Sequence, residues 1–281
     1  MSGLERLPME LLDMIRDRLD LRDTTRLAAT CRSFYQMGWG HSKWNVDRYL
    51  ERSGWVTSGA RLRQVLGQAE AYIVGQTVFD FLRGREGRKH YMTVMVLSDD
   101  GEEGRDVEVL QRHLENEEGY TAEERRLGVP RDQWMAKDRS RILLRGLLSR
   151  DVRSYWTEEA RYSTLVSFLS HNKLVSLCPY LTFVEKVFFQ TGAGFPLPWV
   201  EERLVADGWQ DGQVWLSKTT KRQKARCCGQ VRFLAAVDEE GQLDPVGRPN
   251  NAEYGMEEIT GLSKLPFGLH TRFVTGRGGD A

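Results

Sequence analysis

Residues 7–35, LPMELLDMIRDRLDLRDTTRLAATCRSFY, contain the pattern around which the chain is organised. Pro8 suits the first position of a helix, because the N–H that proline lacks has no partner there. Asp23 is a favourable N-cap for a second helix. Two helices this short cannot bury both apolar faces against each other, so we expect a third helix and a partner protein. Apolar residues follow Pro8 at the spacing of one helical face: Leu11, Leu12, Ile15 and Leu19.

At these residues the segment resembles an F-box, the helical module through which substrate receptors bind the Skp-type adaptor of cullin-type ubiquitin ligases. The matching features are Leu7-Pro8, Glu10, Leu11, Ile15, Leu19, Asp23, Leu27 and the run Thr30-Cys31-Arg32. An ordinary amphipathic helix pair is the alternative interpretation. The resemblance implies a three-helix module at residues 1–52. It also implies six residues that contribute to or support the adaptor contact: Leu7, Pro8, Leu11, Ile15, Leu19 and Leu27.

Length and charge limit the classes of protein that the chain can represent. The chain has 281 residues, enough for one large or two smaller domains. Forty basic residues balance forty acidic ones, so nothing in the net charge favours nucleic acid or an anionic membrane as a partner. No apolar run has the length of a signal peptide or a membrane helix. We therefore expect a soluble intracellular protein, cytoplasmic or nuclear, that binds neither nucleic acid nor a membrane.

Cysteine and histidine spacing predicts neither a metal site nor a cofactor. Cys227 and Cys228 are adjacent, which differs from the spacing of a zinc knuckle or a redox pair. No histidine is spaced from a cysteine as zinc ligands are. His171, between two apolar runs, is interpreted as a helix cap or a partly buried side chain. The motifs of serine hydrolases, P-loop proteins and zinc proteases are also absent from the sequence.

The remaining chain alternates strand and helix patterns, so the predicted fold class is α+β. Residues 53–275 are expected to form this second domain, and residues 276–281 a disordered tail. Between residues 117 and 141 we expect helix fragments and loop. A basic stretch at 218–226 is interpreted as a solvated hairpin loop rather than a phosphate-binding surface. Residues 142–148 and 152–156 are either two strands or a strand and a helix, and the pattern does not decide between them. The predicted strands are 71–74, 91–97, 213–216 and 231–237, and the predicted helices are 61–66, 77–82, 106–115, 164–177 and 199–208.

Several segments within residues 70–210 resemble fungal F-box proteins that carry a nucleotidyltransferase-like domain. They are AYIVGQTVFDFL (71–82), YMTVMVL (91–97), VEVLQRHLENEEGY (107–120), SFLSHNKLVSLCPYLTF (167–183) and PWVEERLVADGW (198–209). Active members place Gly-Ser after the first strand and two acids, one residue apart, on the next strand to hold magnesium. This chain has Gly75-Gln76 at the turn, and Tyr91 and Thr93 at about the acid positions. The resemblance therefore implies a degenerate domain, a pseudo-nucleotidyltransferase with no catalytic residues.

Together these features favour an F-box substrate receptor of a Skp–cullin–F-box ubiquitin ligase. Its partners would be a Skp-type adaptor, through it a cullin, and a target protein that the sequence does not identify. Such a receptor is not an enzyme, because it acts by bringing its target close to the ligase. Two alternatives stay open: a nucleotide-binding or nucleotidyltransferase-like protein whose N-terminal helices are merely structural, and an F-box protein that works outside a ligase.

Overall fold

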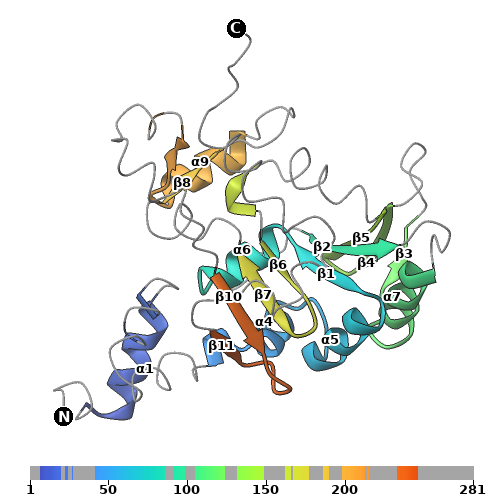
Figure 1. Ribbon diagram of the computed structural model, residues 1–281, viewed down its shortest axis with the longest axis horizontal. Coiled ribbons are helices and arrows are strands. Elements are labelled where there is room, and N and C mark those ends of the chain that lie inside the picture. Colours follow the sequence, from blue (N-terminus) through green and yellow to red (C-terminus); the bar gives the residue numbers. More distant parts are fainter. Residues whose placement is uncertain are drawn as a thin grey trace, which may run out of the picture.

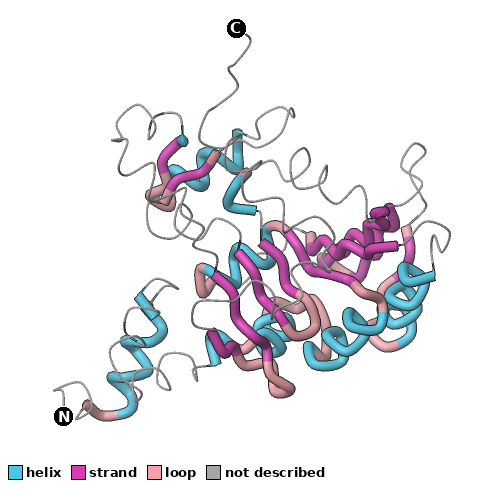
Figure 2. Tube along the Cα trace, viewed as in Figure 1, coloured by secondary structure: helices cyan, strands magenta, loops and turns pink. Residues whose placement is uncertain are grey.

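A computed structural model gives the arrangement of the chain (Figure 1). It describes residues 7–19, 23–24, 27, 42–85, 91–98, 105–123, 132–148, 162–165, 167–176, 186–189, 198–212, 214 and 233–245. Figure 2 shows the strands side by side in the body of the molecule, with helices along its lower side. The described part is a mixture of helices with a mixed sheet, so the predicted α+β class is confirmed.

The body of the molecule is a nine-stranded sheet with the order β11-β10-β7-β6-β1-β2-β5-β4-β3. Within it, β2 and β5 are parallel, and the other pairings are antiparallel. Parallel neighbours need a crossover connection, and here α7 and the strands β3 and β4 lie between β2 and β5 in the chain. The strands are β1 (Ala71–Val74), β2 (Met92–Ser98), β3 (Thr121–Ala122), β4 (Asp132–Lys137), β5 (Ser140–Leu148), β6 (Ser167–Leu169), β7 (Lys173–Ser176), β10 (Phe233–Val237) and β11 (Leu243–Pro245).

Helices α4 (Val46–Arg52), α5 (Gly59–Gln68) and α7 (Arg105–Asn116) line the lower side of the sheet in Figure 1. Alternate residues of each strand point to this side, as the two-residue period of a strand requires. In β2 the core side chains are Met92, Val94 and Val96. They join one hydrophobic core with residues from the helices and the neighbouring strands, among them Leu62, Leu66, Ile73, Leu110, Leu114, Ile142 and Leu144.

A smaller unit near the end of α6 (Gln76–Leu82) contains α9 (Pro198–Ala206) and a parallel strand pair, β8 (Val187–Phe188) and β9 (Gln210–Asp211). The carboxylate of Asp207 accepts a hydrogen bond from Arg83 at 2.8 Å and two from Arg85 at 2.9 Å. The rings of Phe79 and Trp209 meet edge to face with centroids 5.4 Å apart. These contacts fasten the unit to the end of α6.

Several predicted elements are confirmed, and their observed bounds differ from the predictions by at most two residues. They are β1, β2, α5, α6, α7 and α9, together with the described part of β10. Residues 142–148, for which the pattern did not decide, are part of the strand β5, and residues 152–156 lie outside the described residues. The predicted turn at Gly75 is confirmed by its φ of +76°, a conformation that glycine adopts without steric cost. The basic stretch 218–226 and the tail 276–281 lie outside the described residues.

The prediction of a buried helix at 164–177 is wrong, because this segment is mainly the hairpin of β6 and β7, preceded by a short 3₁₀ turn, η5 (Ser163–Leu165). A short apolar run has the same appearance in a buried helix and in a buried strand. The turn is set by Ser170, whose hydroxyl accepts a hydrogen bond from the backbone N–H of Lys173 at 3.0 Å. Such serine turns compete with helical hydrogen bonds.

Three further predictions need correction. The stretch 117–141 contains β3, β4 and the start of β5 at the edge of the sheet, and in β4 the buried side chains of Gln133 and Met135 alternate with partly buried ones. A hairpin turn there uses Asp138 at φ +51°, which aspartate tolerates. Strand β11 (Leu243–Pro245) was not predicted, because the residues around it are typical of turns. In the predicted strand 213–216, Val214 is helical and the other positions lie outside the described residues.

No helix among the described residues has the length and apolar character needed to cross a membrane.

Candidate functional site

The N-terminal helix α1 (Met9–Arg18) carries five of the six residues expected at the adaptor contact, on it or directly beside it. Pro8 precedes the helix by one residue instead of opening it, and its carbonyl accepts hydrogen bonds from the N–H groups of Leu11 and Leu12, each at 3.1 Å. Glu10 lies in the first turn, and Arg16 and Arg18 lie in the last. Acidic residues at the start and basic residues at the end of a helix stabilise its dipole.

Helix α1 has one buried side and one exposed apolar side. Leu12 is 7% exposed, whereas Leu11 is 44% exposed and Met14 is 57% exposed. Residues three apart lie next to each other on a helix surface, so Leu11 and Met14 form a continuous apolar patch. We call these two side chains the α1 patch. It is a candidate binding surface, since exposed large hydrophobic side chains that adjoin one another often mark an interaction site.

The predicted contact residues differ in exposure. Pro8 and Leu11 are exposed, and the other four are partly buried: Leu7, Ile15, Leu19 and Leu27. Leu27 has a helical backbone, but most of its sequence neighbours lie outside the described residues. Sequence reasoning placed Leu11 and Leu12 on one face, whereas the structure puts them on different sides. It also missed Met14, which its three-residue spacing from Leu11 could have identified.

The helix that follows the N-terminal segment is held by the far end of the chain. Asn45 is the N-cap of α4, and its side-chain oxygen accepts a hydrogen bond from the N–H of Arg48 at 2.9 Å. The amide group of the same side chain donates to the carbonyl of Glu240 at 2.8 Å. The N–H of Val46 donates to the carbonyl of Gly241, also at 2.8 Å. Glu240 and Gly241 belong to the turn between β10 and β11, so the start of α4 meets the last described hairpin here.

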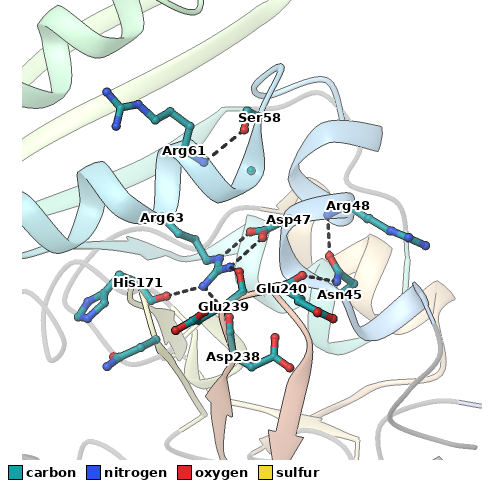
Figure 3. A network of polar contacts seen from close by, with 12 residues as sticks. Asn45, Asp47, Arg48, Ser58, Arg61, Arg63, His171, Asp238, Glu239 and Glu240 are labelled. Carbon is teal, nitrogen blue, oxygen red and sulfur yellow. Dashed lines mark hydrogen bonds and ion pairs between the residues drawn. The ribbon is translucent and has the colours of Figure 1, made fainter.

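Figure 3 shows the buried ion pair beside this contact, between Asp47 of α4 and Arg63 of α5. Arg63 Nε donates to Asp47 Oδ1 at 2.6 Å and Nη2 donates to Oδ2 at 2.8 Å. The remaining donors of the guanidinium reach three backbone carbonyls, those of His171, Asp238 and Glu239, at 2.9 to 3.0 Å. One arginine therefore joins two helices to two strand turns.

The turn that follows β1 is the second candidate site. Val74 pairs with Thr93, which brings the start of β2 beside Gly75. Tyr91 is 49% exposed, and its ring meets that of Trp134 edge to face at 5.3 Å. Neither Tyr91 nor Thr93 has a carboxylate, the ligand that magnesium prefers, so these two side chains do not fit the ion. Among the described residues, no three His, Cys, Asp or Glu side chains gather as metal ligands. Asp99 and Asp100 lie outside the described residues.

Comparison with known proteins finds a match to one family in the N-terminal segment. An F-box-like family model matches residues 4–45. The chain is therefore similar to F-box-like domains over these residues. The matched segment contains α1 and the α1 patch, and it ends at Asn45, the residue that caps α4. No curated protein and no solved structure matches the chain. The resemblance of segments within residues 70–210 to nucleotidyltransferase-like domains has no support from these comparisons and stays a prediction.

Proposed function

We propose that the chain is an F-box-type receptor that binds a Skp-type adaptor through the α1 patch. F-box motifs generally bind such adaptors, and the family match covers α1. The observation that carries the proposal is the pair Leu11 and Met14, exposed on a helix whose opposite side is buried. Apolar side chains at the centre of an interface supply most of its binding energy. The patch is small, so the partly buried residues beside it, Leu7 and Ile15, complete the contact.

In this proposal the α+β body presents a target protein to the ligase and performs no bond chemistry. The body acts by proximity, because a target held close to the ligase reacts as though its concentration were raised. The resemblance given in the sequence analysis supports this proposal, since it aligns Tyr91 and Thr93, neither of which has a carboxylate, with the magnesium-binding acids. The order of β1, the Gly75 turn, α6 and β2 supports a further proposal, that the body is related to nucleotidyltransferases and lacks their acids.

Co-purification from cells that co-express a Skp-type adaptor tests the adaptor contact. The test variant is the double substitution Leu11→Ala with Met14→Ala. The matched control is Val205→Ala with Val214→Ala, which removes two exposed apolar side chains from the body (57% and 46% exposed). We expect the wild type and the control to retain the adaptor and the test variant to lose it, while all three unfold at similar temperatures. A folded wild type that recovers no adaptor would refute the proposal.

A further inference from the structure

Lys43 connects the end of α1 to the body of the protein. Its ammonium group donates hydrogen bonds to the backbone carbonyls of Asp17 and Leu19, at 2.8 Å and 2.6 Å. These carbonyls belong to the last turn of α1 and to the residue after it, where a helix has carbonyl groups without intrahelical partners. The partial negative charge at a helix C-terminus attracts a cation. The side chain of Lys43 therefore binds the backbone of α1, although the two are more than twenty residues apart in the sequence.

The side chain of Lys43 reaches α1 by passing across Gly84, at the end of α6. A Cβ atom at position 84 would lie 1.9 Å from Lys43 Cε and 2.7 Å from Nζ. Gly84 also has a φ of +61°. The absence of a side chain at this position is thus what gives the lysine its path. The tip of Lys43 lies between the C-termini of two helices, α1 and α6.

The backbone next to Lys43 is fixed in the body. Lys43 belongs to the short 3₁₀ turn η2 (Ser42–Trp44). Trp44 is 1% exposed and packs edge to face on Phe81 with centroids 6.1 Å apart. Asn45 and Val46, the next two residues, bond to the β10–β11 turn as described above. Lys43 therefore extends from a rigid base to the helix that bears the α1 patch.

We propose that Lys43 is a positioning residue that fixes the direction of α1 relative to the sheet. Its consequence for the ligase rests on the proposed function: a target on the body would stand at a defined distance from the adaptor. A stiff connection of matched length raises the effective concentration of one bound group near another, and a loose connection lowers it. The hydrogen bonds from Lys43 to α1 end on the backbone carbonyls of Asp17 and Leu19 and not on the α1 patch, so its loss should affect geometry and leave adaptor affinity unchanged.

The test measures the distance between α1 and the body in the full-length chain. Spin labels are introduced as non-canonical amino acids at two exposed positions, Glu10 on α1 and Gln68 on α5, so that the native cysteines are retained. Double electron–electron resonance then reports the distribution of their separation. We expect one narrow distribution in the wild type. Lys43→Met should give a broad distribution of distances. The control Lys186→Met, which removes an exposed ammonium elsewhere, should keep the narrow distribution.

A second variant tests the same proposal without touching the lysine. Gly84→Ala places a methyl group in the path of the side chain and should broaden the distribution as Lys43→Met does. A narrow, unshifted distribution in both variants would overturn the proposal. Adaptor capture is measured in parallel on the same proteins. If the wild type does not capture the adaptor, the proposed function is refuted. The role of Lys43 is still tested, because the distance measurement needs no adaptor.

Discussion

Gly241 lies against the carboxylate of Asp47: a Cβ atom at position 241 would be 2.4 Å from Asp47 Oδ2. The same oxygen receives a hydrogen bond from Arg63. Because Gly241 is in the turn between β10 and β11, the C-terminal hairpin can approach the ion pair only where a side chain is absent. The glycine at 241 is therefore a condition for the contact between α4 and the β10–β11 hairpin.

Gly241→Ala should destabilise the protein more than Gly208→Ala does. The two glycines have nearly the same positive φ, +80° and +83°. Both substitutions therefore carry the strain of a left-handed alanine, about 1–2 kcal/mol. A Cβ at Gly208 would meet no atom within 4 Å, whereas one at Gly241 displaces Asp47 from Arg63. Urea denaturation measures the two losses, and equal losses would contradict the close approach.

Arg63→Met should lower the free energy of unfolding by about 3–5 kcal/mol, because it leaves Asp47 as a buried charge without its partner. The side chains of this pair are 8% and 10% exposed. The control is Arg61→Met, which breaks an ion pair with Glu117 whose side chains are 44% and 46% exposed. Solvent screens such a pair, so we expect little change in the control. Similar effects of the two variants in urea denaturation would argue against the role given to Arg63.

His171 should make the protein less stable below about pH 6.5. His171 is exposed at the β6–β7 turn, and the part of its side chain that packs on the protein still loses enough water to lower its pKa below the ordinary value of 6.5. The positive charges of Lys173 and Arg63 add to the effect. The unfolded chain then binds a proton on this histidine more readily than the folded protein does. Stability is therefore lost as the pH falls through about 6.5. Unfolding free energies at about pH 7.5 and about pH 5 should differ less in His171→Gln than in the wild type. An unchanged difference would contradict this assignment.

Substitutions at Leu12 and Leu11 should differ in their effect on the stability of α1. Leu12→Ala removes a buried side chain and should reduce the free energy of opening of the helix by about 2–5 kcal/mol. Leu11→Ala truncates an exposed side chain and should change that free energy little. Hydrogen exchange of the α1 amides measures both. If the two variants exchange alike, the helix does not have the buried and exposed sides described for it.

Much of the helical part of the fold could be predicted from the sequence, because local signals set it. Helix α5 begins after Ser58, whose side chain accepts a hydrogen bond from the N–H of Arg61, and α9 is followed by Gly208. The hairpin of β6 and β7 could not be predicted in this way. Its apolar runs are short, and its strand character comes from pairing with β1 and β10, which are distant in the chain.

The candidate site was only partly predictable for the same reason. The apolar spacing of α1 predicts a helix that buries one side, but it does not say which leucine is buried, since this depends on what packs against the helix. Leu11 and Leu12 are adjacent in the sequence and differ from 44% to 7% in exposure. The roles of Lys43 and Arg63 depend on carbonyl groups of distant residues, which leave no pattern in the sequence.

Isothermal titration calorimetry with a purified Skp-type adaptor tests the central claim most directly. The proteins compared are the wild type, Leu11→Asp, which puts a charge in the α1 patch, and Val205→Asp, which puts one on an exposed valine of α9. We expect the wild type and Val205→Asp to bind the adaptor with the same affinity. Leu11→Asp should weaken the free energy of binding by about 2 kcal/mol or more, as expected for an interface hot spot. Equal binding by Leu11→Asp, or no binding by the folded wild type, would contradict binding through the α1 patch.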